Sequence, residues 1–136
     1  MVKAVIDTNV LFSGLTNGDV ASDLVIQAWQ AGIFQAYVST AIALEYQEVL
    51  SRKLSSAGWL YAERALRTLL NQAIPVPIHF SWKPASKDPG DNLVIDCALN
   101  ANAIVVTHNR KDFRQAQREL GLQVLNAVDF VVLISA

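Results

Sequence analysis

Hydrophobic and polar positions follow two patterns along the chain, short strand-like runs and longer segments with helical spacing. Short, mainly apolar runs occupy residues 2–6, 34–38, 104–107 and 122–125 and are typical of strands, and the first of them is rich in β-branched residues. Between them, apolar residues recur at helical spacing, and this spacing predicts helices at residues 19–31, 40–54, 61–72, 91–102 and 112–120. Strands that alternate with helices predict a parallel sheet with helices on both faces.

Glycine and proline refine these boundaries. Gly32 and Gly121 follow two of the predicted helices as C-terminal stop signals, and Ser39 or Thr40 caps the helix that runs to about residue 54. Prolines within residues 74–78 predict an edge strand or an extended connection, and residues 82–90 a loop. We expect a single domain over residues 1–136, a three-layer α/β/α sandwich with a mainly parallel central sheet.

Composition agrees with one soluble, folded unit. Of 136 residues, 52% are hydrophobic and 17% are charged, with a net charge of −1, so disorder is excluded. Residues 24–44 carry no charge, but glutamines and Gly32 interrupt them, and this pattern does not predict a membrane span. The N-terminal residues show no secretory leader, and we expect a cytoplasmic protein without membrane contact.

The few cysteines and histidines limit the metal chemistry. Cys97 is the only cysteine, which excludes an intramolecular disulfide and a thiolate-rich metal site. His79 and His108 are too far apart in sequence to predict a histidine cluster. Any metal ion would therefore be held by oxygen ligands.

Acidic residues fall where parallel sheets place their ligands, at the carboxyl ends of strands. They follow predicted strands or begin the helices beside them: Asp7, Glu45, Asp88, Asp91 and Asp112, with Asn109 among them. Carboxylates gathered in one crevice repel one another, and a hard cation such as Mg²⁺ or Mn²⁺ relieves that repulsion. Such a cation activates water and bridges a phosphodiester.

Each acid also has a structural interpretation. Asp7 and Asp88 are typical turn residues, and Asp91 and Asp112 are good helix N-caps. Glu45 and Asp96 are also compatible with solvated helix surfaces. No single acid decides between structure and function.

Four ordered motifs together carry a resemblance to a known family. They are Asp7-Thr8-Asn9-Val10-Leu11, Ser39 followed by Glu45-Tyr46-Gln47-Glu48-Val49-Leu50, Asp88-Pro89-Gly90-Asp91-Asn92, and Val106-Thr107-His108-Asn109-Arg110-Lys111-Asp112-Phe113. In order and spacing they resemble a PIN domain over nearly the whole chain. The chain looks most similar to the VapC-like toxin ribonucleases of toxin–antitoxin pairs.

This resemblance implies a ribonuclease that uses one or two Mg²⁺ or Mn²⁺ ions held by an acidic quartet. Asp7, Glu45 and Asp91 match the first three acids, whereas the fourth position holds Asn109. Asp96 or Asp88 then supplies the missing charge. Asp96 is also a catalytic candidate, whereas Asp112 is assigned a structural role. The remaining assignments are polar residues that orient ligands and water, Thr8, Asn9, Thr107 and Asn109, and cations that contact the RNA backbone, Arg110 and Lys111.

We therefore expect hydrolysis of RNA phosphodiester bonds by the toxin of a toxin–antitoxin pair. The alternative is a non-catalytic PIN-like module that binds nucleic acid or protein. A phosphoryl-accepting receiver or phosphatase is disfavoured, because Asp7 has no acidic neighbour at the spacing those sites use. Apolar residues between 41 and 72 exceed what one helix face requires and predict a homodimer or an antitoxin-binding surface.

Overall fold

Five parallel strands form the centre of the molecule in the order β3-β2-β1-β4-β5. The computed structural model describes residues 1–82 and 88–136. The strands are β1 (Lys3–Ile6), β2 (Gln35–Val38), β3 (Ile74–Pro75), β4 (Ile104–Val106) and β5 (Val124–Leu125). The fold class expected from the sequence is confirmed.

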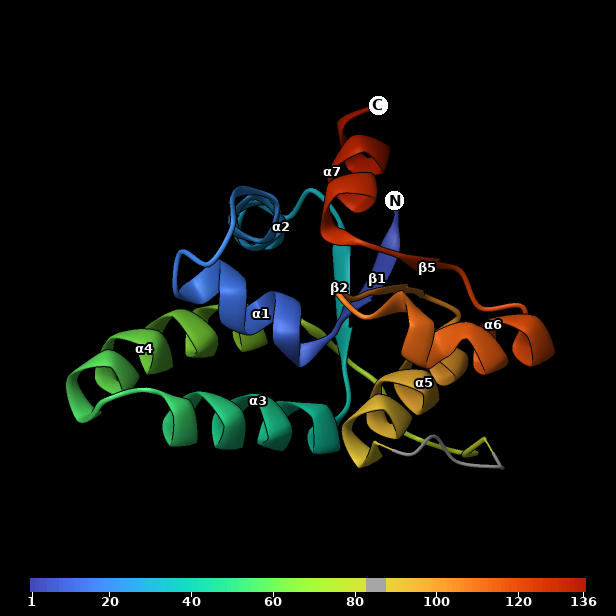
Figure 1. Ribbon diagram of the computed structural model, residues 1–136, viewed down its shortest axis with the longest axis horizontal. Coiled ribbons are helices and arrows are strands. Elements are labelled where there is room, and N and C mark those ends of the chain that lie inside the picture. The colour runs from blue at the N-terminus through green and yellow to red at the C-terminus, as the bar shows by residue number, and fades with distance from the viewer. Residues whose placement is uncertain (83–87) are drawn as a thin grey trace.

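Helices cover both faces of this sheet. They are α1 (Thr8–Leu15), α2 (Val20–Gln30), α3 (Thr40–Lys53), α4 (Ser56–Gln72), α5 (Pro89–Ala101), η1 (Arg110–Phe113), α6 (Arg114–Leu120) and α7 (Ala127–Ser135). Figure 1 shows α1 to α4 on one side of the sheet and α5 and α6 on the other. From β3, at one edge of the sheet, the chain returns to β4 beside β1, and helix α5 in this connection lies on the other face of the sheet.

The core forms around β1, which pairs with β2 on one side and β4 on the other. Ala4, Val5 and Ile6 are almost completely buried, as expected for a central strand with helices on both faces. The hydroxyl of Tyr46 on α3 donates a hydrogen bond to the Ile6 carbonyl oxygen. This contact fixes α3 against the end of β1.

Two helices were not predicted from the sequence. Helix α1 begins directly after β1 because Asp7 caps it, its Oδ1 accepting a hydrogen bond from Thr8 N at 2.8 Å. Helix α7 is rich in β-branched residues, which favour strands, but Asn126 caps it through Asp129 N, and Phe130 is buried in the core.

Two predicted helix starts were also wrong. Helix α4 begins at Ser56 with Ser55 as its N-cap and includes Gly58, whereas the prediction began at residue 61. Helix α5 is capped by Asp88, not by Asp91, which instead lies in its first turn. Of the predicted loop, residues 83–87 lie outside the described residues, and Pro89 and Gly90 already belong to α5.

No helix in residues 1–82 and 88–136 has the length and apolar character needed to cross a membrane.

Candidate active site

The order of the strands reverses between β1 and β4, and two buried polar side chains meet there. Asp7 follows β1 and Thr107 follows β4, and both are nearly or completely inaccessible to solvent. Thr107 Oγ1 donates a hydrogen bond to Asp7 Oδ2 at 2.7 Å, and Asp7 N donates to the Val106 carbonyl oxygen at 2.9 Å. Such a switch point is where open parallel sheets place a ligand crevice.

Glu45 joins this pair from helix α3. The Thr8 hydroxyl donates a hydrogen bond to Glu45 Oε2 at 2.9 Å, so Thr8 links the start of α1 to α3. Ser39 caps α3 by accepting a hydrogen bond from Ile42 N, which places Glu45 in the second turn of the helix. The short connection from β2 into α3 thus brings Glu45 to the carboxyl edge of the sheet.

The first turn of α5 brings two further carboxylates. Asp88 Oδ1 accepts a hydrogen bond from Gly90 N at 2.9 Å, and Asp91 follows as a buried residue with 6% of its surface exposed. Gly90 itself packs against α3, because a Cβ atom at this position would lie only 2.6 Å from Glu45 Oε1. The absence of a side chain at Gly90 therefore lets α5 approach Glu45.

These four carboxylates line one pocket with a volume of about 500 Å³. Burial and the charges of Asp88, Asp7, Asp112 and Glu45 together raise the pKa of Asp91 to about 7. Burial also raises the pKa of Asp7, against the lowering effect of its hydrogen bonds from Thr107 and Thr8. The carboxylates of this pocket thus repel one another, because the charges of Glu45 and Asp88 also raise the pKa of Asp7.

The donor chemistry of this pocket fits a hard divalent cation. Asp91 Oδ2 is a buried oxygen without a hydrogen-bond partner in the described part of the chain, and its neighbours are carboxylates. Oxygen donors of this kind suit Mg²⁺ and Mn²⁺. However, within residues 1–82 and 88–136 no three His, Cys, Asp or Glu side chains form a ready-made group for a metal ion. The acids share a pocket, but their side chains are not arranged as a closed ligand set.

The polar residues assigned to ligand orientation also lie at this pocket. Asn9 and Asn109 line it with Thr8, and Asn109 N donates a hydrogen bond to Thr107 Oγ1 at 3.0 Å. His108 N donates to Asn9 Oδ1 at 3.3 Å. Thr107 therefore connects the Asn109 position to Asp7.

Asp96 is not among the residues that line the pocket. It lies five positions after Asp91 on α5, and a rotation of about 100° per residue points it about 140° away. Its Oδ1 accepts a hydrogen bond from Trp82 N at 3.0 Å, which ties the segment after β3 to α5. This helical geometry was available from the sequence and argues for a structural role.

Arg110, Lys111 and Asp112 also lie outside the pocket lining. All three are exposed on η1, and Arg110 Nη1 lies 3.9 Å from Asp129 Oδ2. Asp112 nevertheless contributes to the raised pKa of Asp91 through its charge.

Sequence reasoning missed the cations that do line the pocket. They are Arg52 and Lys53 at the end of α3, seven and eight residues after Glu45, which is the spacing of one helix face. His108 lines the pocket as well, and its Nε2 lies 3.4 Å from Asp19 Oδ2 and 3.2 Å from Ser22 Oγ. Helical spacing from Glu45 was a usable signal for Arg52 and Lys53, whereas nothing in the sequence linked His108 to Asp19.

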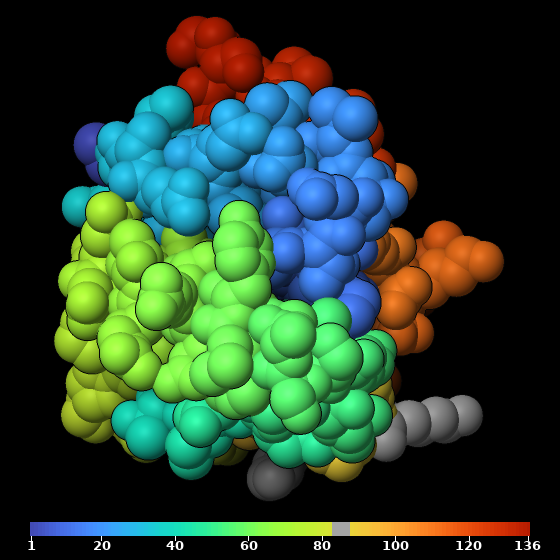
Figure 2. Space-filling model, turned by 90° about the vertical axis from the view of Figure 1, so that its left-hand side faces the viewer, coloured from blue at the N-terminus to red at the C-terminus, as the bar shows by residue number. Residues whose placement is uncertain are grey.

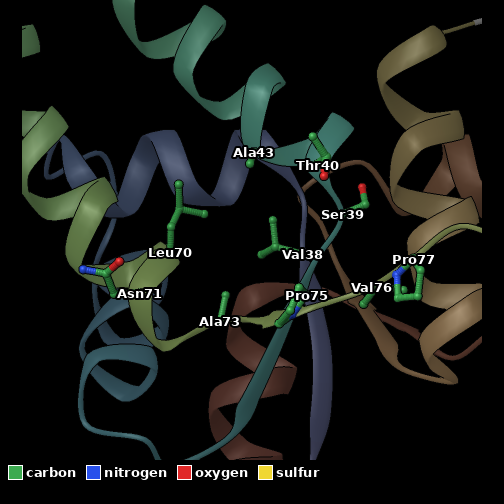
Figure 3. Close-up of a pocket in the computed structure, with 10 residues that line it drawn as sticks. All are labelled: Val38, Ser39, Thr40, Ala43, Leu70, Asn71, Ala73, Pro75, Val76 and Pro77. Atoms are coloured by element: carbon green, nitrogen blue, oxygen red, sulfur yellow. The ribbon is translucent and has the colours of Figure 1, made fainter.

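A larger pocket of about 660 Å³ lies beside the β3 edge, where α3, α4 and the ends of β2 and β3 meet (Figure 3). Its lining, within the described part of the chain, contains no ionisable side chain and includes Val38, Ala43, Leu70, Val76 and two prolines. Despite its size, it offers no acid, base or metal ligand from these residues. We therefore assign the chemistry to the smaller acidic pocket.

Comparison with known proteins identifies the family. The sequence model of the PIN domain matches residues 3–111. The chain belongs to the PIN domain family. The four carboxylates at the β1/β4 switch point thus lie in a PIN domain, and family and fold together support a nuclease.

Solved structures show the same fold. A chain of VapBC2 from Rickettsia felis bound to a DNA fragment from their promoter is similar with a TM-score of 0.66 and 17% identity, over 92% of this chain and 98% of that chain. A chain of VapBC-1 from nontypeable Haemophilus influenzae is similar with a TM-score of 0.62 and 16% identity, over 94% and 99%. No curated protein matches the sequence.

Proposed function

We propose that this PIN domain is a divalent-metal-dependent ribonuclease that acts as the toxin of a toxin–antitoxin pair. The observation that carries the proposal is the convergence of Asp7, Glu45, Asp88 and Asp91 on one pocket at the switch point of the sheet. Residues 1–136 act as one domain in this proposal. RNA as the substrate rests on the resemblance to VapC-like toxins.

Asp7, Glu45 and Asp91 would hold one or two Mg²⁺ or Mn²⁺ ions, with Asp88 as a further oxygen donor. A bound cation supplies a Lewis acid that offsets the carboxylate charge and stabilises charge developing on the phosphate. Asp7 is suited to a fixed position, because both of its carboxylate oxygens already accept hydrogen bonds, from Thr8 N and Thr107 Oγ1. Asp96 does not line this pocket, accepts a hydrogen bond from Trp82 N and enters the proposal as a structural residue.

Asp91 is the best-placed residue to accept the proton of the attacking water. Its Oδ2 has no hydrogen-bond partner in the described chain, whereas both carboxylate oxygens of Asp7 already accept hydrogen bonds, so Asp91 can serve as a ligand through one oxygen and as a base through the other. Thr8 holds Glu45 in place, and Asn9 and Asn109 supply amide groups that orient the substrate at the pocket wall. Water attacks phosphorus as its proton passes to Asp91, and the bond from phosphorus to the leaving ribose oxygen breaks, with that oxygen taking up a proton from solvent.

An antitoxin partner is also part of the proposal, and it is supported by the fold shared with chains of VapBC structures. Most apolar residues of the 41–72 region pack into the core, including Leu50, Leu66 and Leu69. Leu44 and Leu60 remain 62% and 65% exposed, and they support a protein-binding or homodimer surface on α3 and α4.

Cleavage assays test the nuclease proposal. Wild-type protein with Mn²⁺ should cleave a single-stranded RNA and leave DNA of the same sequence intact, and EDTA should abolish cleavage. Asp7→Asn should be inactive while its circular dichroism spectrum matches wild type. Asp23→Asn is the matched control, because Asp23 accepts a hydrogen bond from Gln27 on the surface of α2, does not line the pocket and should not affect cleavage. Equal cleavage by wild type and Asp7→Asn would refute the proposal.

The second candidate function is a non-catalytic PIN-like binding module. Two observations favour it, namely the neutral Asn109 at the fourth acidic position and the lack of a ready-made metal group among the described residues. It predicts that RNA or protein binds without turnover in Mn²⁺. Isothermal titration with Mn²⁺, run beside the cleavage assay, distinguishes metal binding from catalysis.

A further inference from the structure

The pocket extends away from the carboxylates along one face of α3. Glu45, Val49, Arg52 and Lys53 line it at positions i, i+4, i+7 and i+8. With a rise of about 1.5 Å per residue, Arg52 and Lys53 lie roughly 10–12 Å along the helix from Glu45. This separation of backbone positions exceeds the size of one phosphate group, so these cations can contact the phosphate next to the one held at the carboxylates.

The opposite wall of this extension is formed by α1. Asn9, Phe12 and Ser13 line it at positions i, i+3 and i+4, so one face of α1 looks toward α3. Figure 2 shows the surface of α1 in blue directly against the surface of α3 and the start of α4 in green. The two helices therefore enclose a groove that leads from the acids to the cations.

The far end of the groove combines an aromatic ring with positive charge. Lys53 Nζ lies 5.1 Å from the centre of the Phe12 ring, in the range of a cation–π contact. Arg52 Nε pairs with Glu48 Oε1 at 2.8 Å, but both side chains are more than half exposed, so solvent weakens this pair and a phosphate can replace it. Aromatic faces beside cations are the usual elements of single-strand binding grooves.

We propose that Phe12, Arg52 and Lys53 form a subsite for the nucleotide adjacent to the scissile phosphate of a single-stranded RNA. The proposal rests on the ribonuclease function proposed above. Arg52 and Lys53 bind the neighbouring phosphate, Lys53 leaving its position over the Phe12 ring, and the base packs on the ring face that Lys53 vacates, with Val49 beside it. A duplex cannot present an unstacked base to Phe12, so the subsite selects single strands.

This subsite differs from the position expected from the sequence. Arg110 and Lys111 lie on η1 outside the pocket lining, and Arg110 is near Asp129. Arg52 and Lys53 lie on the pocket wall itself. The two pairs of cations can therefore be tested against each other.

Equilibrium binding of a labelled single-stranded RNA in EDTA, measured at several salt concentrations, separates these contributions. R52A/K53A should weaken binding roughly tenfold at low salt and lower the slope of log K against log salt by about 0.7, because one phosphate is no longer neutralised. F12L should weaken binding about five- to hundredfold with an unchanged slope, because it removes stacking and no charge.

R64A/R67A is the matched control, because Arg67 forms an exposed i,i+4 pair with Glu63 on α4 just as Arg52 does with Glu48 on α3. It removes the same charge and should leave the slope near that of wild type. An equal loss in R64A/R67A, or a loss confined to R110A/K111A, would overturn the subsite.

Cleavage of the same RNA by wild type in Mn²⁺ keeps the two proposals apart. If wild type cleaves while R52A/K53A and F12L bind normally, the subsite is wrong and the ribonuclease proposal stands. If wild type neither binds nor cleaves RNA, both are wrong. If R52A/K53A and F12L weaken binding as stated but wild type does not cleave, the groove binds RNA and the ribonuclease proposal fails.

Discussion

The hydroxyl of Thr107 donates a hydrogen bond to Asp7 Oδ2 at 2.7 Å, and this bond joins the ends of two neighbouring strands. It stabilises the charged form of a buried carboxylate whose pKa burial would otherwise raise further. The protonation state of Asp7 therefore depends on the hydroxyl of Thr107.

Replacement of this hydroxyl should impair both stability and activity. Thr107→Val keeps the shape of the side chain but leaves Asp7 Oδ2 without its donor and Asn109 N without its acceptor. We expect a loss of about 1–3 kcal/mol in unfolding free energy and an Asp7 pKa that rises further. Urea denaturation and a pH–rate profile measure both effects. Thr107→Ser, which retains the hydroxyl, should behave like wild type, and similar losses in both variants would contradict this account.

Asp91 should make the metal-free protein less stable as pH rises. An ordinary aspartate has a pKa of 3.8, whereas the pKa of Asp91 in the folded protein is about 7, so between these values the folded chain binds more protons than the unfolded chain. Unfolding free energy therefore falls from about pH 4 to about pH 7 and does not recover above that range. A difference of about three pKa units corresponds to an effect of roughly 4 kcal/mol.

Urea denaturation in EDTA across this pH range tests the Asp91 prediction. Asp91→Asn should flatten the pH dependence and be more stable than wild type near neutral pH, because it removes a buried, uncompensated charge. Mn²⁺ should stabilise wild type and not Asp91→Asn. A pH dependence that persists unchanged in Asp91→Asn would show that other groups cause it.

Gly90 should be more important for activity than for stability. An added Cβ would lie 2.6 Å from Glu45 Oε1, the end of a flexible side chain that can turn away. We expect Gly90→Ala to fold with a change of less than about 1 kcal/mol, since alanine favours helices, and to lose at least about tenfold in cleavage rate as Glu45 is displaced. Gly58→Ala, in the first turn of α4, is the control and should retain full activity.

Gly14, in contrast to Gly90, should be important for stability. Its Cβ position lies 2.3 Å from Ile26 Cγ1 and 2.7 Å from the Ser22 carbonyl oxygen, so α1 and α2 must separate to accept a side chain. We expect Gly14→Ala to destabilise the protein by about 1–3 kcal/mol. Thermal unfolding measures this loss, and a melting temperature equal to that of wild type would mean that the helices are less tightly packed.

The sequence predicted the layers of the fold because strand periodicity and stop signals are local features. It failed at α7, where β-branched residues favour a strand and only packing of Phe130 and the Asn126 cap favour a helix. It placed Asp7, Glu45, Asp88 and Asp91 at one edge because the topology of a parallel sheet dictates this. It assigned Asp96 to the same group through the family resemblance, as a substitute for the acid missing at Asn109, although the rotation of the helix points Asp96 away from Asp91.

The cations Arg52 and Lys53 of the pocket show a different limit of prediction from sequence. Helical spacing places Arg52 and Lys53 on the face of Glu45, but this face lines a groove only because α1, which the sequence did not predict, forms the opposite wall. Motifs indicated which residues lie near the strand ends. Tertiary packing decided which other side chains face them.

The two prolines at the edge of the sheet restrict how another protein can dock beside β3. Val76 N donates inward to the Val38 carbonyl oxygen, so its neighbours Pro75 and Pro77 occupy the positions whose N–H groups would point outward. This edge therefore offers an incoming strand no amide donors at those two positions. A partner that occupies the adjoining apolar pocket must therefore be recognised through its side chains. The same two prolines suppress chance pairing between the sheet edges of two copies of the protein.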